Sequence, residues 1–165
     1  MFNHLFEITL IAATLATGLV AGVFLTFSDF VMRALGRARP GAGIEAMQWI
    51  NREVYRSLFM VLLIGLAVAS LLLAAAGAAL AGGEVARWLT AAAILYLLGV
   101  MAVTARRNVP MNERLDAVDH AGAVATSYWE IYKRDWTRWN HLRWIAALAA
   151  SVCYLGATFA LVGPT

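Results

Sequence analysis

The chain has 165 residues, of which 62% are hydrophobic and only 14% are charged. A soluble domain has about 45–50% apolar and about 25% charged residues, so this composition excludes an ordinary soluble domain and indicates a membrane protein. The one cysteine, Cys153, excludes an intramolecular disulfide and a redox cycle between paired thiols.

Four stretches of the chain carry no Asp, Glu, Lys or Arg: residues 8–28, 57–83, 88–105 and 144–165. Each is close to or above the roughly 18–20 residues that a helix needs to cross the bilayer core. Helices are expected because lipid offers backbone groups no hydrogen-bond partner. The sequence therefore predicts an all-α, integral membrane four-helix bundle in a single domain over residues 1–165, with spans at about 5–31, 57–80, 86–105 and 140–161.

The first span is predicted to be retained, because it lacks a preceding basic region and is longer than the apolar core of a secretion signal. It ends near Asp29. A carboxylate so close to a span is costly if it faces lipid. Asp29 is therefore expected either to pair with Arg33 at the interface or to belong to a site.

The second helix is predicted to have an amphipathic first half at about 44–56 before its apolar run. Gln48, Arg52 and Tyr55 recur there at helical spacing, opposite an apolar stripe. This polar stripe faces either solvent or a cavity between helices, and both alternatives stay open.

The third span is expected to end at Arg106 and Arg107, because Pro110 follows and disfavours a continuing helix. The polar residues around it, Asn108 and Asn112, would then form a compact elbow at the membrane surface, with Asn112 able to cap a following helix.

A further amphipathic segment at about 121–138 precedes the fourth span. The junction, residues 135–144, holds three tryptophans, two arginines, an asparagine and a histidine. Trp136, Asn140 and Arg143 share one helical stripe. Such a cluster is either an interfacial anchor, in which tryptophans form a belt and arginine reaches the headgroups, or the wall of a site.

Nearly all the charge gathers at one end of the predicted bundle. When the four spans alternate in direction, twelve of the thirteen Lys and Arg residues and eight of the ten acids fall at the same end, and only Arg87 among the cations falls at the other. The positive-inside rule places this end in the cytoplasm. We therefore expect an integral protein of a bacterial inner membrane with both termini in the periplasm and any chemistry at the cytoplasmic end.

Two motifs at this end resemble those of the anthrone oxygenase-like family of small four-helix membrane proteins. They are Pro110-Met111-Asn112-Glu113-Arg114-Leu115 and Trp136-x-x-x-Asn140-x-x-Arg143, and the early Gly22-x-Phe24 with Ser28 is also similar. The resemblance implies an oxygenase that acts on polycyclic anthrones without a metal or organic cofactor. It also implies that Asn112, Asn140 and Arg143 are recurring polar positions of the site. Asp29 departs from the pattern, which has a proline or small residue there, so it inherits no role.

In a cofactor-free oxygenase a base removes an acidic C–H proton and the resulting carbanion reduces O₂ directly, so the protein must supply a base, oxyanion donors and a dry aromatic slot. His141 is the expected base, because histidine exchanges protons near neutral pH. Arg143, Asn140 and Asn112 are expected to hold the oxyanion. Trp136 and Trp139 are expected to stack on a flat substrate, and the remaining candidate lining residues are Asp29, Gln48, Tyr55 and Asn108.

Two other hypotheses stay open. One is a non-catalytic membrane module that binds a lipid, a quinone or a partner protein, since the basic end would attract anionic headgroups. The other is a metal or haem protein using His120 and His141, although no ligand pair at metal-binding spacing occurs. The expected partners are membrane lipids and a small hydrophobic or aromatic molecule, without nucleic acid, and association into a homo-oligomer stays open.

Overall fold

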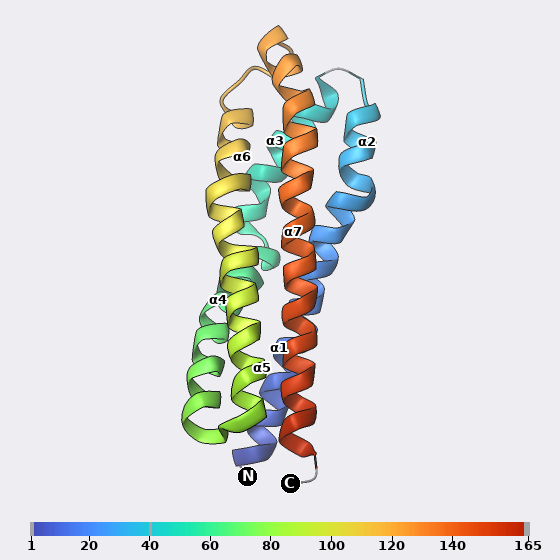
Figure 1. Ribbon diagram of the computed structural model, residues 1–165. Helices are drawn as coiled ribbons and strands as arrows, with labels where there is room; N and C mark the ends of the chain where they lie inside the picture. The colour runs from blue at the N-terminus through green and yellow to red at the C-terminus, as the bar shows by residue number, and fades with distance from the viewer. Residues whose placement is uncertain (1, 40, 164–165) are drawn as a thin grey trace.

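The computed structural model describes residues 2–39 and 41–163 as four long helical segments that run antiparallel, with both termini at the same end (Figure 1). No strand occurs in those residues. The segments consist, in order, of α1 (Phe2–Thr26), η1 (Phe27–Val31) and α2 (Met32–Arg37); α3 (Ala42–Glu53), η2 (Val54–Arg56), α4 (Leu58–Ala76) and η3 (Gly77–Ala81); α5 (Gly83–Ile94), η4 (Leu95–Ala102), η5 (Thr104–Asn108) and α6 (Val109–Asp116); and α7 (Ala123–Val162). Of the short elements, η2 is a 3₁₀ turn and the others are π-helical.

All four segments contain a stretch long and apolar enough to cross a membrane, which confirms the predicted all-α membrane bundle. Large apolar side chains stand exposed along these stretches, among them Leu15, Leu19, Val61, Val68 and Leu72. In water such a surface would favour aggregation, whereas in lipid it makes ordinary apolar contacts. Two buried tyrosines in this part of the bundle have hydrogen-bond partners: the Tyr154 hydroxyl donates to Ser70 Oγ at 2.8 Å and the Tyr96 hydroxyl to the carbonyl of Leu63 at 3.1 Å.

The bundle has an apolar half and a polar half. Two apolar core clusters fill the half near the termini, where α1, α4, α5 and α7 pack together. A third cluster fills the other half and is built from α2, α3, α6 and the first turns of α7. The polar half therefore has its own core and forms a cap on the membrane-spanning half.

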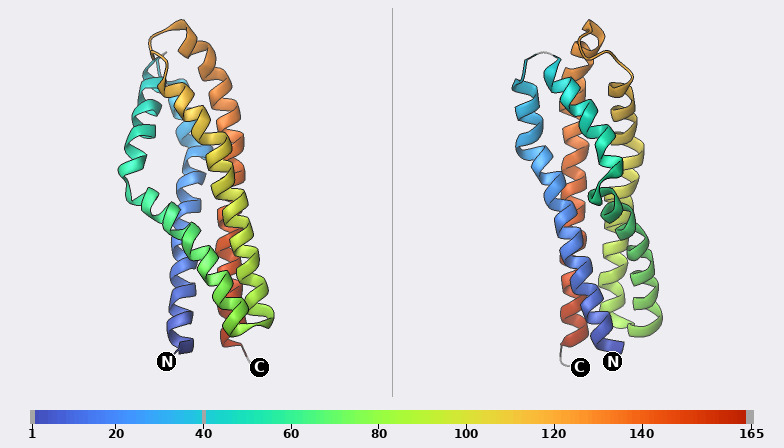
Figure 2. Two further views of the ribbon diagram at one scale, coloured as in Figure 1. Left: turned by 90° about the vertical axis from the view of Figure 1, so that its left-hand side faces the viewer. Right: turned by 180° about the vertical axis from the view of Figure 1, so that it is seen from behind.

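The second segment bends sharply where its composition changes. Ser57 is extended, with φ −94° and ψ 157°, between η2 and α4. Its hydroxyl accepts a hydrogen bond from the backbone N–H of Met60 and so caps α4. Figure 2 shows α3 and α4 meeting at an angle, so that α3 leans away from the axis of the bundle.

The third segment contradicts one prediction, because Pro110 does not end it. The helix continues from Gly83 to Asp116, and Pro110 occupies the first turn of α6. A proline inside a helix removes one hydrogen bond and clashes with the carbonyl four residues earlier. The π turn η5, which comes directly before α6, has a wider hydrogen-bonding pattern that accommodates this disruption. The expected elbow at Asn108–Leu115 is instead a helix face directed at its neighbours.

The fourth segment is one uninterrupted helix. α7 joins the amphipathic residues 123–138 to the last span without a break, and it packs mainly on α1 and α5. At the far end of the cap, α2 and α3 approach so closely that a Cβ atom on Gly43 would overlap the carbonyl oxygen of Leu35. Glycine at this position thus allows the α2–α3 hairpin to close over α7.

Candidate functional site

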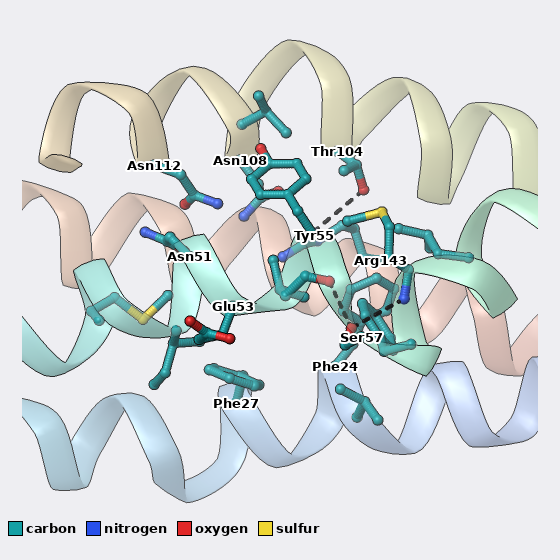
Figure 3. A pocket seen from close by; sticks show the side chains of 18 of the residues that line it. Phe24, Phe27, Asn51, Glu53, Tyr55, Ser57, Thr104, Asn108, Asn112 and Arg143 are labelled. Carbon is teal, nitrogen blue, oxygen red and sulfur yellow. Dashed lines mark hydrogen bonds between the residues drawn. The ribbon is translucent and has the colours of Figure 1, made fainter. Parts of the chain in front are cut away.

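A cavity of about 360 Å³ lies where the apolar and polar halves meet (Figure 3). It is bounded by α1 and η1 on one side, by the bend between α3 and α4 on another, and by η5, α6 and α7. A volume of this size is in the range of small-molecule pockets. The residues that line it are Val23, Phe24, Phe27, Met47, Ile50, Asn51, Glu53, Val54, Tyr55, Ser57, Phe59, Met60, Leu63, Thr104, Asn108, Val109, Asn112, Trp136 and Arg143.

The walls of the cavity are mainly aromatic and apolar. Phe24 and Phe59 meet edge to face, with ring centroids 5.4 Å apart. Phe27 lies 5.9 Å from Trp136, whose indole is buried. Flat rings in these orientations offer faces and edges against which a planar aromatic ligand can pack.

Arg143 places a cation in these apolar surroundings. The side chain is buried, with 5% exposure. Its guanidinium carbon lies 4.3 Å from the centroid of the Phe24 ring and 5.2 Å from that of Trp136. Nη2 donates to Asn140 Oδ1 at 2.7 Å, and Nη1 reaches Thr104 Oγ1 at 3.4 Å (Figure 3 shows the second bond).

No carboxylate within the described part of the chain forms an ion pair with Arg143. Its Nε atom is buried and has no hydrogen-bond partner there. Burial of an unpaired charge costs several kcal/mol, in order of magnitude, unless a counter-ion or polar contacts offset it. The ring faces and the neutral oxygens offset part of this cost, and an anion in the cavity would offset more.

Asn140 fixes the position of Arg143. Its side chain is fully buried, and Nδ2 donates to the backbone carbonyl of Phe24 at 2.6 Å and to Ser28 Oγ at 2.7 Å. The oxygen of the same amide is therefore directed at Arg143. Phe24 lies in the last turns of α1, and Ser28 lies in the π-helical η1, a type of distortion common at functional sites.

Two asparagines on the third segment hold Trp136. Asn112 Oδ1 accepts hydrogen bonds from Trp136 Nε1 and from the Tyr132 hydroxyl, both at 2.8 Å. Asn108 Nδ2 donates to the backbone carbonyl of Trp136 at 3.2 Å. Asn108 Oδ1 is buried without a partner among the described residues, so an acceptor beside the cavity remains unused.

Behind Trp136 the aromatic side chains of α7 form a row. Tyr132 stacks on Trp136 with centroids 6.0 Å apart, and Trp129 stacks on Tyr132 at 5.5 Å. The three residues share one face of the helix and are all buried. This row supports the indole of Trp136 from the side away from Arg143.

The bend between α3 and α4 contributes Asn51, Glu53, Val54, Tyr55 and Ser57 to the lining of the cavity. Glu53 is an exposed residue whose carboxylate has no ion-pair partner among the described residues. The nitrogen of the Asn51 amide is buried and makes no hydrogen bond within the described chain. Asn51 and Tyr55 also line an adjoining polar depression, which the Arg52–Asp116 ion pair, at 2.7 Å, borders.

The structure brings together six of the ten residues expected at the site. Five of them line the cavity and Asn140 lies directly behind it. They are Tyr55, Asn108, Asn112, Trp136, Asn140 and Arg143.

The other four lie elsewhere. Gln48 is buried and donates to the carbonyls of Leu115 and Val118, so it joins α3 to the end of α6. Asp29 is exposed and pairs with Arg33 at 3.1 Å. Trp139 packs under Arg107, on the outer side of α7. His141 is exposed, faces a groove between α2 and α7, and accepts a hydrogen bond from Trp144 Nε1 at 3.0 Å.

Asn51, Glu53 and Thr104 line the cavity but were not predicted from the sequence as site residues. Asn51 and Glu53 precede the point where an amphipathic helix changes to an apolar one. The Glu53 carboxylate at this boundary is the feature of the sequence that could have indicated the site. Thr104 gave no signal, because a lone threonine in a span ordinarily bonds to its own backbone, as its hydroxyl also does here to the carbonyl of Val100. Within residues 2–39 and 41–163, no group of three or more His, Cys, Asp and Glu side chains is arranged to hold a metal ion.

The comparisons with known proteins give one match. A model of the protein family described as Anthrone oxygenase matches residues 52–153, which run from the end of α3 into the last span. No curated protein and no solved structure matches the chain. The matched range contains Glu53, Asn108, Trp136, Asn140 and Arg143 but not the phenylalanines of α1 and η1.

Substitution of Asn140 should destabilise the protein more than substitution of Asn108, although both side chains are fully buried. Asn140→Ala removes the best acceptor of a buried cation, a loss expected to cost about 2–4 kcal/mol, whereas Asn108→Ala removes one neutral hydrogen bond worth about 1 kcal/mol. Thermal unfolding of the two variants in the same detergent measures the difference. Equal melting temperatures would show that Asn140 does not support Arg143.

Proposed function

Because the chain belongs to the anthrone oxygenase family, we propose that its cavity binds a flat, oxygenated aromatic molecule as an anion and lets this anion react with O₂. The observation that carries the proposal is the buried Arg143 guanidinium, with which no carboxylate in the described part of the chain forms an ion pair. A fixed positive charge in a water-poor cavity stabilises negative charge on a ligand far more than it would in water. The site is thus suited to an enolate or phenolate oxygen.

The shape and chemistry of the walls support a planar polycycle. The ring centroids of Phe24 and Trp136 lie 4.3 Å and 5.2 Å from the guanidinium carbon of Arg143, so a ring that packs beside these two residues brings its oxygen close to the cation. The unpartnered Asn108 oxygen could accept from a phenolic hydroxyl of the ligand, and the Asn51 amide could donate to a carbonyl. An anthrone carries both kinds of group.

The proposed reaction begins with loss of a proton from the CH₂ group of the anthrone, which leaves an enolate whose charge Arg143 stabilises. Glu53 is the proposed proton acceptor, because it supplies the one carboxylate among the described residues that line the cavity, and no described residue forms an ion pair with it. In this assignment Glu53 takes the place of His141, which faces the opposite side of α7.

The enolate then gives one electron to O₂, which forms superoxide and a substrate radical. These two combine through a new C–O bond to a peroxide anion. Protonated Glu53 returns its proton to this anion, which gives the hydroperoxide. The second proton on the same carbon and the terminal hydroxide of the hydroperoxide then leave as water, with cleavage of the C–H and O–O bonds, and the carbon becomes the quinone carbonyl. One anthrone and one O₂ give one quinone and one water, so that the substrate supplies all the electrons. Arg143 stabilises the enolate and then the superoxide.

Loss of the Arg143 charge should abolish most of the activity. Arg143→Met keeps much of the side-chain volume but removes the cation, and loss of one donor to a developing oxyanion costs about 10²–10³-fold in rate. The measurement is oxygen uptake with an anthrone, by purified protein in detergent. Arg106→Met, which removes an exposed arginine at the same end, is the matched control and should retain the wild-type rate. An unchanged rate in Arg143→Met, with its folding verified by thermal unfolding, would remove this mechanism.

The identity of the base is tested by comparing carboxylates on the same helix. Glu53→Gln should lower the rate about 10²-fold or more, because general-base catalysis contributes about that much. Glu45→Gln, on an exposed part of α3, should have no effect. His141→Ala distinguishes the two assignments: a rate near wild type supports Glu53, whereas a loss comparable to that of Arg143→Met supports His141. No oxygen uptake with any anthrone would favour the non-catalytic binding module.

We also propose that the polar half lies in the cytoplasm of a bacterial cell, with both termini across the inner membrane. Twelve of thirteen Lys and Arg residues lie in this half, and basic residues near span ends set orientation. Alkaline phosphatase, which is active only in the periplasm, should be active when fused to either terminus. A fluorescent protein that folds only in the cytoplasm should give signal only from an insertion between Asp116 and Ala123. The reverse pattern would overturn the orientation.

A further inference from the structure

A second depression lies on the opposite side of α7 from the cavity, in a groove between the α1–α2 segment and α7. The mechanism does not use it. Its lining residues are Ser28, Met32, Arg33, Gly36, Arg37, Lys133, Arg134, Thr137, Arg138 and His141. We propose that this basic groove binds the phosphate headgroup of an anionic phospholipid.

The position of the basic groove relative to the membrane favours a lipid as its ligand. Its end nearest the membrane is formed by Ser28, the last residue of the first charge-free run, and His141, which lies three residues before the last such run. The groove thus starts where two adjacent spans leave the hydrocarbon and extends into the polar half. Phospholipid headgroups lie at this level.

The charges of the basic groove favour an anion. Five lining side chains are cationic, and none of the described residues that line the groove is a carboxylate. Three neighbouring acids pair with four of these cations: Asp29 with Arg33, Glu130 with Lys133, and Asp135 with Arg134 and Arg138. Arg37 has no ion pair within the described chain, so the cluster keeps a positive excess. A cluster of this kind near a membrane surface attracts acidic lipid.

An apolar path for the acyl chains continues from the groove towards the membrane. On α7, Ile145 and Leu148 follow His141 on the same helix face, and both are about half exposed. On α1, Leu25 precedes Ser28 on the corresponding face and is exposed, while a Cβ atom at Gly22 would meet nothing within 4 Å. A ligand with a phosphate at one end and acyl chains at the other fits a basic groove that continues into an apolar surface, and it fits better than a free phosphate does.

The test is native mass spectrometry of the full chain in a neutral detergent, titrated with phosphatidylglycerol, phosphatidylcholine or inorganic phosphate. Wild-type protein should retain phosphatidylglycerol at least tenfold more tightly than phosphatidylcholine. The double variant Arg37→Gln/Arg138→Gln should lower the affinity for phosphatidylglycerol at least tenfold, since each cation near a lipid surface is worth about fivefold. Binding of inorganic phosphate as tight as that of the lipid would overturn the assignment to a phospholipid.

A matched control separates a local site from general attraction. Arg106→Gln/Arg107→Gln removes the same charge at the same end of the bundle. These two arginines lie in η5, beside another side of α7. The variant should keep the affinity for phosphatidylglycerol within about twofold of the wild-type value. An equal loss in both double variants would overturn the proposal. Should the first double variant fail to fold, Thr137→Phe blocks the groove while keeping every charge, and unchanged lipid binding by that variant would also overturn the proposal.

Discussion

The buried guanidinium of Arg143 is the constraint on which the polar end of this bundle depends. Hydrogen bonds from its donors to oxygens and contacts of its faces with aromatic rings offset part of the cost of burying such a cation. Asn140 supplies the closest oxygen, and Asn140 is itself held by the backbone of α1. Trp136 supplies one ring and is held by Asn112 on α6. Three of the four helical segments are therefore positioned around one charge.

The sequence was sufficient to predict the all-α membrane bundle and one face of α7. A charge-free apolar run of this length predicts a membrane-spanning helix, because helices of soluble proteins rarely contain so many apolar residues in succession. Trp136, Asn140 and Arg143 follow one another at intervals of four and three residues, so helical periodicity already placed them on a single stripe. His141 was chosen for its chemistry, yet a residue adjacent to Asn140 lies about 100° around the helix. Helical periodicity therefore predicted which residues of α7 lie at the cavity better than side-chain chemistry did.

The rest of the site depends on tertiary structure that local patterns do not encode. Pro110 indicated the end of a helix, but the π turn before it allowed the helix to continue, and Asn108 and Asn112 consequently face α7. Glu53 and Asn51 reach the cavity because the second segment bends at Ser57. A bend of this kind follows from how α3 packs on α6, through contacts such as that of Gln48 with the carbonyl of Leu115, which lie far apart in the chain.

The unbroken course of α7 has a consequence for where the cavity lies relative to lipid. Forty residues at 1.5 Å each give a helix about 60 Å long, roughly twice the thickness of the bilayer core. The apolar part beyond Arg143, residues 144–162, measures about 28 Å and matches that core. Since Trp136, Asn140 and Arg143 stand on the same rigid helix, the thickness of the surrounding bilayer sets the depth of the cavity. Hydrophobic mismatch, in a membrane with longer or shorter acyl chains, would therefore change how much water reaches Arg143.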